Sequence, residues 1–314
     1  MKKITVIAEG GGRFGMGHVV RSFTLCQNLN ILSSVNFFLK TETQNSINLS
    51  SKLYFKNTSI IHDEMDCFND IESNSIVIID GYNFNIRSIN KITSHKKLNL
   101  ICIADVQKEI PNCKVLINHL PWVNSEDYKN YNVEKFLLGP NYAIIRPIFF
   151  SKKIKSSGRF LICLGNTSVD DEIKNIYKEL IKKGIKDELI DIIYNKSIKG
   201  LNKKVHSDLN PIEVFKFISK SEYCFITPGN FSYEVFKVNR KCILGSVSKS
   251  QVIPAEEFGK MNLCINVGKW SKANYKLMDF WLLDSSKTIE FQRKIFVNLK
   301  KGFLKKQFNH LINS

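Results

Sequence analysis

The sequence predicts an α/β protein made of two Rossmann-like domains that face one another across a cleft. Short, nearly continuous apolar segments alternate with segments of helical periodicity along most of the 314 residues. Continuous apolar strands are typical of parallel sheets that helices cover on both faces. A polar, lysine-rich stretch, residues 151–159, interrupts this alternation once, near the middle of the chain. Two successive α/β halves joined by a linker therefore predict the two-domain fold class.

The first domain is predicted over residues 1–150. Its expected strands are the apolar runs 4–9, 35–40, 59–62, 75–80, 98–105, 113–118 and 136–139. A helical pattern follows the first of them, with apolar residues at Val19, Val20, Phe23 and Leu25. The spacing predicts repeated strand–helix units and hence a parallel sheet.

The second domain is predicted over residues 151–314. Its expected strands are 160–165, 188–194, 223–227, 241–246 and 263–268. Helical patterns cover 171–183 and 211–220, and another helix begins at Phe231. The last periodic segment, 289–312, predicts a helix or a helix pair that can pack back on the first domain.

Composition bounds the class of protein. Hydrophobic residues make up 43% and charged residues 24%, as in globular proteins. The chain has no apolar run of eighteen residues, so we expect no membrane insertion. The apolar stretch after Lys3 is too short for a signal peptide, which predicts a cytoplasmic protein. The eight cysteines and six histidines show no metal-ligand spacing, so neither a metal nor another cofactor is expected, and we expect a monomer.

The net charge of +17 comes mainly from lysines that are spread along the chain. No cluster of arginine and aromatic residues stands out, which favours a solvated basic surface over nucleic-acid binding. A positive surface would still attract a small molecule that carries phosphate groups.

A glycine-rich turn, "EGGGRFGMGHVVR", joins the first strand to the first helix. Its Gly15 and Gly17 allow backbone N–H groups to approach a ligand, but the pattern matches neither the nicotinamide fingerprint nor the P-loop. His18 falls at the start of the helix, with Arg21 three residues later on the same face. The helix dipole disfavours imidazolium, so His18 is expected to be neutral and able to act as a general base. The alternative is a glycine turn whose histidine only caps the helix.

Polar residues end consecutive strands of the first half. Asp80 and Tyr82 follow one strand, Asp105 ends the next, and Asn118 ends the one after that. The carboxyl ends of parallel strands meet at one edge, where α/β proteins bind ligands. Ordinary helix caps would look the same, because Asp and Asn favour that position.

Further candidates lie in turns. Tyr142 and Arg146 form a turn before the linker, which is a binding segment or only the turn that closes the domain. Three strand-to-helix turns of the second half carry the candidate nucleotide-binding residues Gly165, Asn166, Gly229, Asn230, Ser232, Glu234 and Gln251. Amides at such turns can hold a diphosphate, and a carboxylate one turn into the helix can accept from ribose hydroxyls.

These motifs together resemble one enzyme family over nearly the whole chain. "GMGHVVR", "IIDGYN", the aspartate of "IAD", "VLIN", "LLGPNYAIIR", "CLGN", "SYE" and "SKSQ" occur in the order found in the UDP-2,4-diacetamido-2,4,6-trideoxy-β-L-altropyranose hydrolases of pseudaminic acid biosynthesis and in related spore-coat polysaccharide proteins. The resemblance implies a metal-independent hydrolase of GT-B-like fold. Water would attack the anomeric carbon of a UDP-sugar, with C–O cleavage and inversion. The chain departs from the family pattern at "CLGNTSVDD", at Ala104 and at "TPGNFSYE".

The resemblance also assigns roles to residues. His18 would activate the water, Gly229 and Asn230 would hold the diphosphate, and Glu234 would bind the uridine ribose. Tyr82 and Asn118 would line the sugar. The carboxylate that orients His18 stays open between Asp80 and Asp105, both of which end strands.

Two other function classes remain open. A GT-B glycosyltransferase would pass the sugar of a UDP-sugar to an acceptor instead of water. A protein that only binds nucleotide sugars or nucleic acid would show no turnover.

Overall fold

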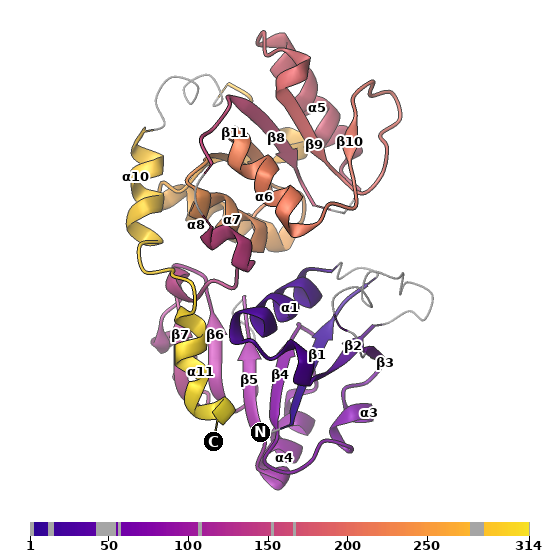
Figure 1. Cartoon of the computed structure of the whole chain (residues 1–314), viewed down its shortest axis with the longest axis vertical. Helices are drawn as coiled ribbons and strands as arrows, with labels where there is room; N and C mark the ends of the chain where they lie inside the picture. The colour runs from indigo at the N-terminus through magenta and orange to yellow at the C-terminus, as the bar shows by residue number, and fades with distance from the viewer. Residues whose placement is uncertain are drawn as a thin grey trace. The chain divides into compact units, whose positions relative to one another are not determined.

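The computed structural model describes residues 3–11, 16–41, 55, 58–105, 109–151, 154–165, 168–276 and 286–313. The chain divides into two compact units (Figure 1). The first comprises Met1–Pro147 together with Leu299–Ser314, and the second comprises Ile148–Asn298. Each unit contains one parallel sheet with helices on both faces.

The first unit holds a seven-stranded sheet of order β3-β2-β1-β4-β5-β6-β7. Its strands are β1 (Ile4–Glu9), β2 (Val35–Lys40), β3 (Thr58–Ile61), β4 (Ile76–Asp80), β5 (Asn99–Ile103), β6 (Cys113–Asn118) and β7 (Val133–Leu138). The central pair β1 and β4 is in register with Ala8 opposite Asp80. After β1 the chain continues to β2 on one side of this pair, and after β4 it continues to β5 on the other side. The strand order therefore reverses between β1 and β4. In open parallel sheets this switch point is where ligands bind.

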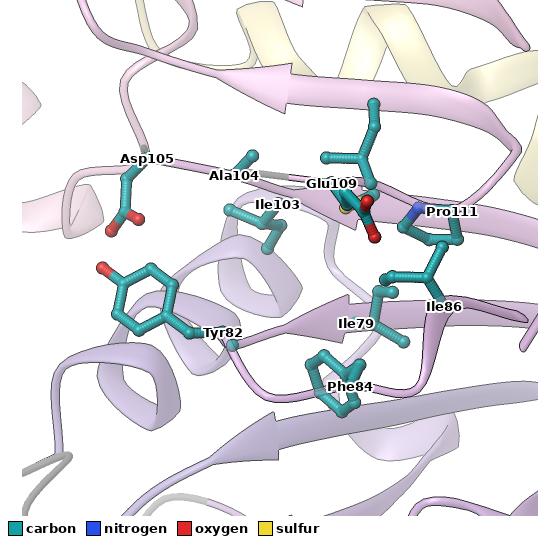
Figure 2. A pocket seen from close by; sticks show the side chains of 12 residues that line it. Ile79, Tyr82, Phe84, Ile86, Ile103, Ala104, Asp105, Glu109 and Pro111 are labelled. Carbon is teal, nitrogen blue, oxygen red and sulfur yellow. The ribbon is translucent and has the colours of Figure 1, made fainter. Parts of the chain in front are cut away.

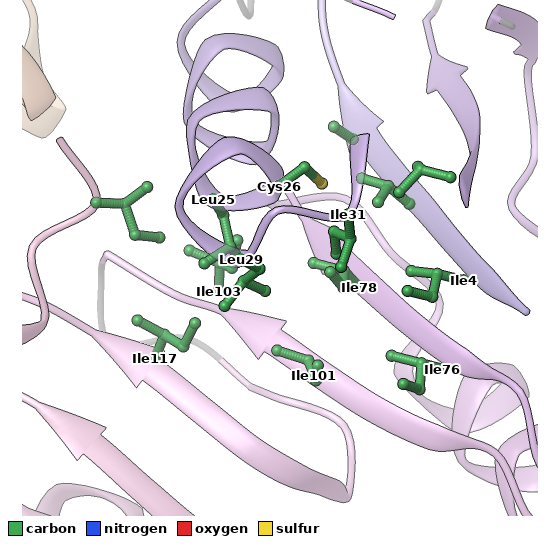
Figure 3. Packing of buried hydrophobic residues seen from close by; sticks show 14 of the residues in the cluster. Ile4, Leu25, Cys26, Leu29, Ile31, Ile76, Ile78, Ile101, Ile103 and Ile117 are labelled. Atoms are coloured by element: carbon green, nitrogen blue, oxygen red, sulfur yellow. The ribbon is translucent and has the colours of Figure 1, made fainter. Parts of the chain in front are cut away.

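Helices cover both faces of the first sheet. They are α1 (Gly17–Leu29), α3 (Met65–Phe68), α4 (Ile86–Lys96) and α11 (Phe303–Asn313). On one face Leu25 and Leu29 of α1 pack on Ile78 and Ile103 of the sheet, as Figure 3 shows. The C-terminal helix α11 belongs to the same cluster, and the Nζ of Lys135 in β7 donates to its backbone at 2.9 Å. The opposite apolar cluster includes residues of α3 and α4.

The second unit holds a six-stranded sheet of order β10-β9-β8-β11-β12-β13. Its strands are β8 (Arg159–Cys163), β9 (Ile190–Ile193), β10 (Val205–His206), β11 (Ser221–Ile226), β12 (Lys241–Ser246) and β13 (Ile265–Lys269). Its helices are α5 (Asp170–Lys182), α6 (Pro211–Lys220), α7 (Asn230–Val238), α8 (Val252–Lys260) and α10 (Ser286–Ile295). The strand order reverses between β8 and β11, which is a second switch point.

Short 3₁₀ turns connect several of these elements. They are η2 (Leu32–Ser34), η4 (Ser125–Tyr128), η5 (Pro140–Tyr142), η6 (Pro147–Phe150), η7 (Asp187–Leu189), η8 (Lys249–Gln251) and η9 (Trp270–Lys272). The final periodic segment of the sequence forms the pair α10 and α11, which belong to different units. The eight cysteines are free thiols. Across the described ranges, no helix has the length and apolar character needed to cross a membrane.

Candidate active site

The switch point of the first sheet brings the residues of the glycine-rich turn and of β4 together. His18 is the second residue of α1, and Arg21 lies on the same helix face one turn later. Asp80 is the last residue of β4 and has no exposed surface. The Nδ1 of His18 lies 2.8 Å from Oδ1 of Asp80, and the Nε of Arg21 donates to Oδ2 at 2.8 Å.

The carboxylate of Asp80 accepts hydrogen bonds from further groups as well. The Nη2 of Arg21 also donates to Oδ1, and the hydroxyl of Ser22 donates to Oδ2 at 3.3 Å. Burial alone would raise the pKa of Asp80, but the charge and hydrogen bonds of Arg21 and the contact with His18 outweigh it, so the pKa is lowered. Asp80 is therefore an ionised carboxylate that can only accept hydrogen bonds.

This acceptor decides which nitrogen of His18 carries a hydrogen. The Nη2 of Arg21, a donor, lies 3.1 Å from Nδ1, but the ionised Asp80 is closer at 2.8 Å and requires a donor, so a neutral His18 ring carries its hydrogen on Nδ1. The other ring nitrogen, Nε2, is then the acceptor. His18 is 6% exposed, so the ring is nearly enclosed. The arrangement can take a proton at Nε2 and stabilise the resulting imidazolium through Asp80.

Asp105 forms the second branch of the cluster. The Nη1 of Arg21 donates to its Oδ2 at 2.7 Å. Burial would raise the pKa of Asp105, yet Arg21, His18 and a hydrogen bond from Tyr82 lower it to about 2. The pKa of Tyr82 is raised by burial and by Asp105. The ring of Tyr82 also meets the His18 ring edge-on, with centroids 4.7 Å apart.

A pocket adjoins Tyr82 and Asp105. Figure 2 shows the phenol of Tyr82 and the carboxylate of Asp105 turned toward one another at one end of it. Most of its other walls are apolar, and they include Ile79, Phe84, Ile86, Cys102, Ile103 and Pro111. It can therefore take a small apolar group beside the polar cluster.

Several predicted site residues of this unit are buried. Asp80 and Asn118 have no exposed surface and Arg21 is 4% exposed, so their side chains bind other groups of the protein in this structure, and their contacts with a substrate stay predictions. The amide of Asn118 instead donates to the hydroxyl of Tyr128 at 2.7 Å and accepts from the backbone N–H of Leu120 at 3.0 Å. These bonds hold the chain after β6. Arg21 joins the two carboxylates of the cluster.

Of the two candidate carboxylates, Asp80 is the one that contacts the His18 ring. Asp80 hydrogen-bonds to His18, and Asp105 acts on Arg21 and Tyr82. A further buried acid, Glu9 at the end of β1, is 1% exposed and was missed by sequence reasoning. The signal that could have found it is an acidic residue at the end of an otherwise apolar strand.

The remaining described candidates of the first unit, Tyr142, Arg146 and Gly17, take no part in the hydrogen bonds of the cluster described above. Tyr142 in η5 packs its ring against Phe303 of α11, with centroids 5.4 Å apart, so it helps to fix the C-terminal helix. Arg146 is partly exposed beyond that turn. Gly17 is the first residue of α1, and a Cβ there would meet no atom within 4 Å. Gly15 lies outside the described residues.

The second unit places its candidates at the carboxyl edge of its own sheet. Gly165 follows β8 with φ +89°, a backbone conformation that favours glycine. Gly229 and Asn230 stand at the start of α7, after β11, so they flank the switch point with Gly165. Asn166 lies outside the described residues.

Three side chains after these strands are engaged or enclosed. The hydroxyl of Ser232 accepts from the backbone N–H of Gly229 at 3.2 Å and donates to the carbonyl of Thr227 at 3.0 Å. Glu234 lies one turn into α7 and is 2% exposed. Gln251 accepts from the backbone N–H of Val247 at 2.9 Å and thereby holds the turn after β12. Ser232 and Gln251 thus shape their turns.

No family model and no curated protein matches the chain. Solved structures of similar fold include the glycosyltransferase of kitacinnamycin. It is 10% identical in sequence with a TM-score of 0.64, and the alignment covers 99% of this chain and 98% of that protein's chain. Phytolacca americana UGT2, complexed with UDP-2-fluoro-glucose and pterostilbene, is 9% identical with a TM-score of 0.65. The alignment covers 100% of this chain and 99% of the UGT2 chain. A UDP-N-acetylglucosamine 2-epimerase is 10% identical with a TM-score of 0.58. The alignment covers 100% of this chain and 98% of the epimerase chain. At this identity the likeness shows the fold, two Rossmann-like domains of the GT-B class, as the sequence predicted.

Proposed function

We propose that the chain is an enzyme that breaks the bond between the anomeric carbon of a UDP-sugar and the diphosphate oxygen, with His18 as the base that activates the attacking oxygen. The observation that carries the proposal is the 2.8 Å hydrogen bond between Nδ1 of His18 and the buried Asp80 at the switch point. The names of two solved structures of similar fold include a UDP-sugar, which supports this substrate class.

The mechanism follows from the hydrogen bonds of the cluster. Asp80 holds the hydrogen on Nδ1, so Nε2 accepts the proton from the nucleophile as its oxygen attacks the anomeric carbon. The imidazolium that forms is stabilised by Asp80, and Arg21 keeps Asp80 ionised. A positioned base of this kind contributes about 10²–10⁴-fold to the rate.

The leaving group departs as UDP. In this proposal the N-terminus of α7, which begins at Asn230, meets the charge of the diphosphate with its first backbone N–H groups, while the N–H of Gly229 donates to the Ser232 hydroxyl. UDP is a good leaving group, so the reaction needs no second carboxylate to protonate it, unlike an ordinary glycosidase.

The finer proposal is that the nucleophile is water and the sugar is a 2,4-diacetamido-2,4,6-trideoxy sugar. The motif resemblance described above supports it. The apolar pocket beside Tyr82 supports it as well, because one methyl group of such a sugar would gain from burial there.

A second candidate is glycosyl transfer to an acceptor hydroxyl. Two of the three structures named above favour transfer over hydrolysis. One is named as a glycosyltransferase, and the other holds a UDP-sugar together with a second small molecule, pterostilbene. The same His18–Asp80 pair would serve both reactions, since an acceptor hydroxyl also loses a proton on attack.

One assay separates these functions. UDP release is measured with a panel of 2-acetamido and 2,4-diacetamido UDP-sugars, with and without candidate acceptor alcohols. Release from the sugar nucleotide alone supports hydrolysis, and release only with an acceptor supports transfer. His18→Gln is expected to lower kcat by about 10²-fold or more with UDP affinity unchanged. Wild-type turnover by the folded His18→Gln variant contradicts the assignment of the base.

A further inference from the structure

We propose that Glu9 is a positioning residue, whose buried carboxylate holds the backbone after β4 so that Tyr82 stays against His18. The inference concerns residues outside the hydrogen-bonded cluster of His18, Arg21, Asp80 and Asp105. Where it concerns turnover, it rests on the proposed function.

Glu9 binds the loop directly. Its carboxylate accepts from the backbone N–H of Tyr82 at 2.6 Å and from that of Asn83 at 2.9 Å, and the residue is 1% exposed. The register between β1 and β4 explains the contact, because Ala8 lies opposite Asp80 and Glu9 therefore comes beside the residue after the strand. That residue is Gly81, where a Cβ would lie 2.6 Å from the Cγ of Glu9. The carboxylate thus occupies the space that a side chain at position 81 would need.

Two more charged residues hold the same loop from other elements. Glu64, just before α3, is 1% exposed and accepts from the backbone N–H of Asn85 at 2.5 Å. The Nζ of Lys40, at the end of β2, donates to the carboxylate of Glu64 and to the carbonyl of Asn83. We call Glu9, Lys40 and Glu64 the loop clamp. Together they fix the backbone between β4 and α4 at both of its ends.

The loop clamp acts on the site through Tyr82. The Glu9 carboxylate accepts from backbone N–H groups of the loop, whereas the side chain of Tyr82 donates to Asp105 through its phenol and makes a T-shaped ring contact with His18. A loop displacement of about 1 Å would loosen both contacts, and misplacement on that scale can cost about 10²-fold in rate. A carboxylate that only stabilised the fold would leave this geometry unchanged when lost.

The test uses three variants of the full chain and one matched control. Glu9→Gln replaces one acceptor oxygen by an NH₂ group that cannot accept from a backbone N–H. Gly81→Ala keeps the carboxylate but pushes it aside, and Lys40→Met removes the ammonium contacts at a residue outside the core. The control is Glu72→Gln, since Glu72 pairs with Lys3 at 2.5 Å on the surface with its side chain 63% exposed.

Two readouts are taken from each folded variant. The first is kcat and KM for UDP release, and the second is the NMR signals of the His18 ring, assigned by their loss in His18→Gln. Glu9→Gln and Gly81→Ala are expected to lower kcat by about 10- to 100-fold with KM unchanged, and to shift the His18 signals. Lys40→Met is expected to act in the same direction, and Glu72→Gln to match the wild type.

The inference is overturned if the folded variants keep the wild-type kcat and His18 signals, or if only KM changes. Should Glu9→Gln fail to fold, Gly81→Ala and Lys40→Met decide in the same way. The NMR readout needs no turnover. If the wild type releases no UDP from any sugar nucleotide but the His18 signals still shift in the variants, the proposed function fails and the positioning role of Glu9 stands.

Discussion

Replacing Asp80 by asparagine keeps the size of the side chain and removes its charge, which tests whether this buried carboxylate sets the state of His18. Asp80 takes hydrogen bonds from His18, Arg21 and Ser22 and has no exposed surface. In Asp80→Asn one of the two oxygens becomes an NH₂ group that faces donors. Arg21 donates to both oxygens and therefore loses one acceptor in either orientation of the amide, and His18 loses its acceptor when the NH₂ group takes the place of Oδ1.

The magnitudes follow from burial. Removing one partner of a buried ion pair costs about 3–5 kcal/mol of unfolding free energy, and the lower end applies here because Arg21 keeps its 2.7 Å contact with Asp105. In activity, an NH₂ group beside Nδ1 favours the tautomer with its hydrogen on Nε2, which cannot accept a proton. We expect kcat for UDP release to fall by about 10²–10⁴-fold, which is about 3–5 kcal/mol of transition-state stabilisation. KM should stay unchanged, because Asp80 has no exposed surface and its hydrogen bonds go to side chains of the protein.

The control is Asp105→Asn, which removes a carboxylate from the same arginine without removing the acceptor of His18. Its loss of stability should be similar, and its loss of kcat at least tenfold smaller. Urea denaturation and initial rates measure the two effects. Equal losses of kcat in both variants, or a rise of KM alone in Asp80→Asn, would refute the role given to Asp80.

Three further predictions concern stability and are all checked by urea denaturation. Leu29→Ala should cost about 2–5 kcal/mol, because Leu29 is 2% exposed in the cluster between α1 and the first sheet; a cost below 1 kcal/mol would contradict that packing. Gly245→Ala should cost about 1–3 kcal/mol, since the new Cβ would lie 2.9 Å from the ring of Trp270, and a neutral result would show that the ring moves freely. Burial lowers the pKa of His119 from 6.5 to about 4, so the unfolded chain binds a proton first as the pH falls, and stability should drop by about 3 kcal/mol between pH 6.5 and pH 4. His119→Gln should remove most of that drop, and an unchanged slope would assign it to other groups.

Most strands could be predicted because they are nearly continuous apolar runs. The predicted run 113–118 coincides with β6, and the predicted 35–40 with β2. Elements with mixed composition were harder to predict. The prediction for β7 began at residue 136, whereas the strand begins at Val133, where exposed and half-buried residues weaken the apolar signal. The two-residue strand β10 carries no periodicity at all.

The candidate site could be predicted only in part. The sequence places Asp80, Asp105 and Asn118 at one sheet edge, but strand ends look alike in sequence whether their side chains turn toward the site or into the core. Asn118 turns inward to Tyr128, and Asp80 turns toward His18. Glu9 was missed because its partners are backbone N–H groups, which every residue except proline offers, so no residue type marks them.

The charge balance of the cluster gives a further reason to regard His18 as a base. The sequence supports only one effect, the positive end of the α1 dipole, which favours a neutral ring. The structure adds two buried or half-buried carboxylates, Asp80 and Asp105, against one guanidinium, Arg21, so that the cluster with neutral His18 carries one net negative charge. Taking up a proton at His18 makes the cluster neutral. The two effects oppose one another, and a base needs both: a ring that is neutral before attack and surroundings that stabilise its cation afterwards.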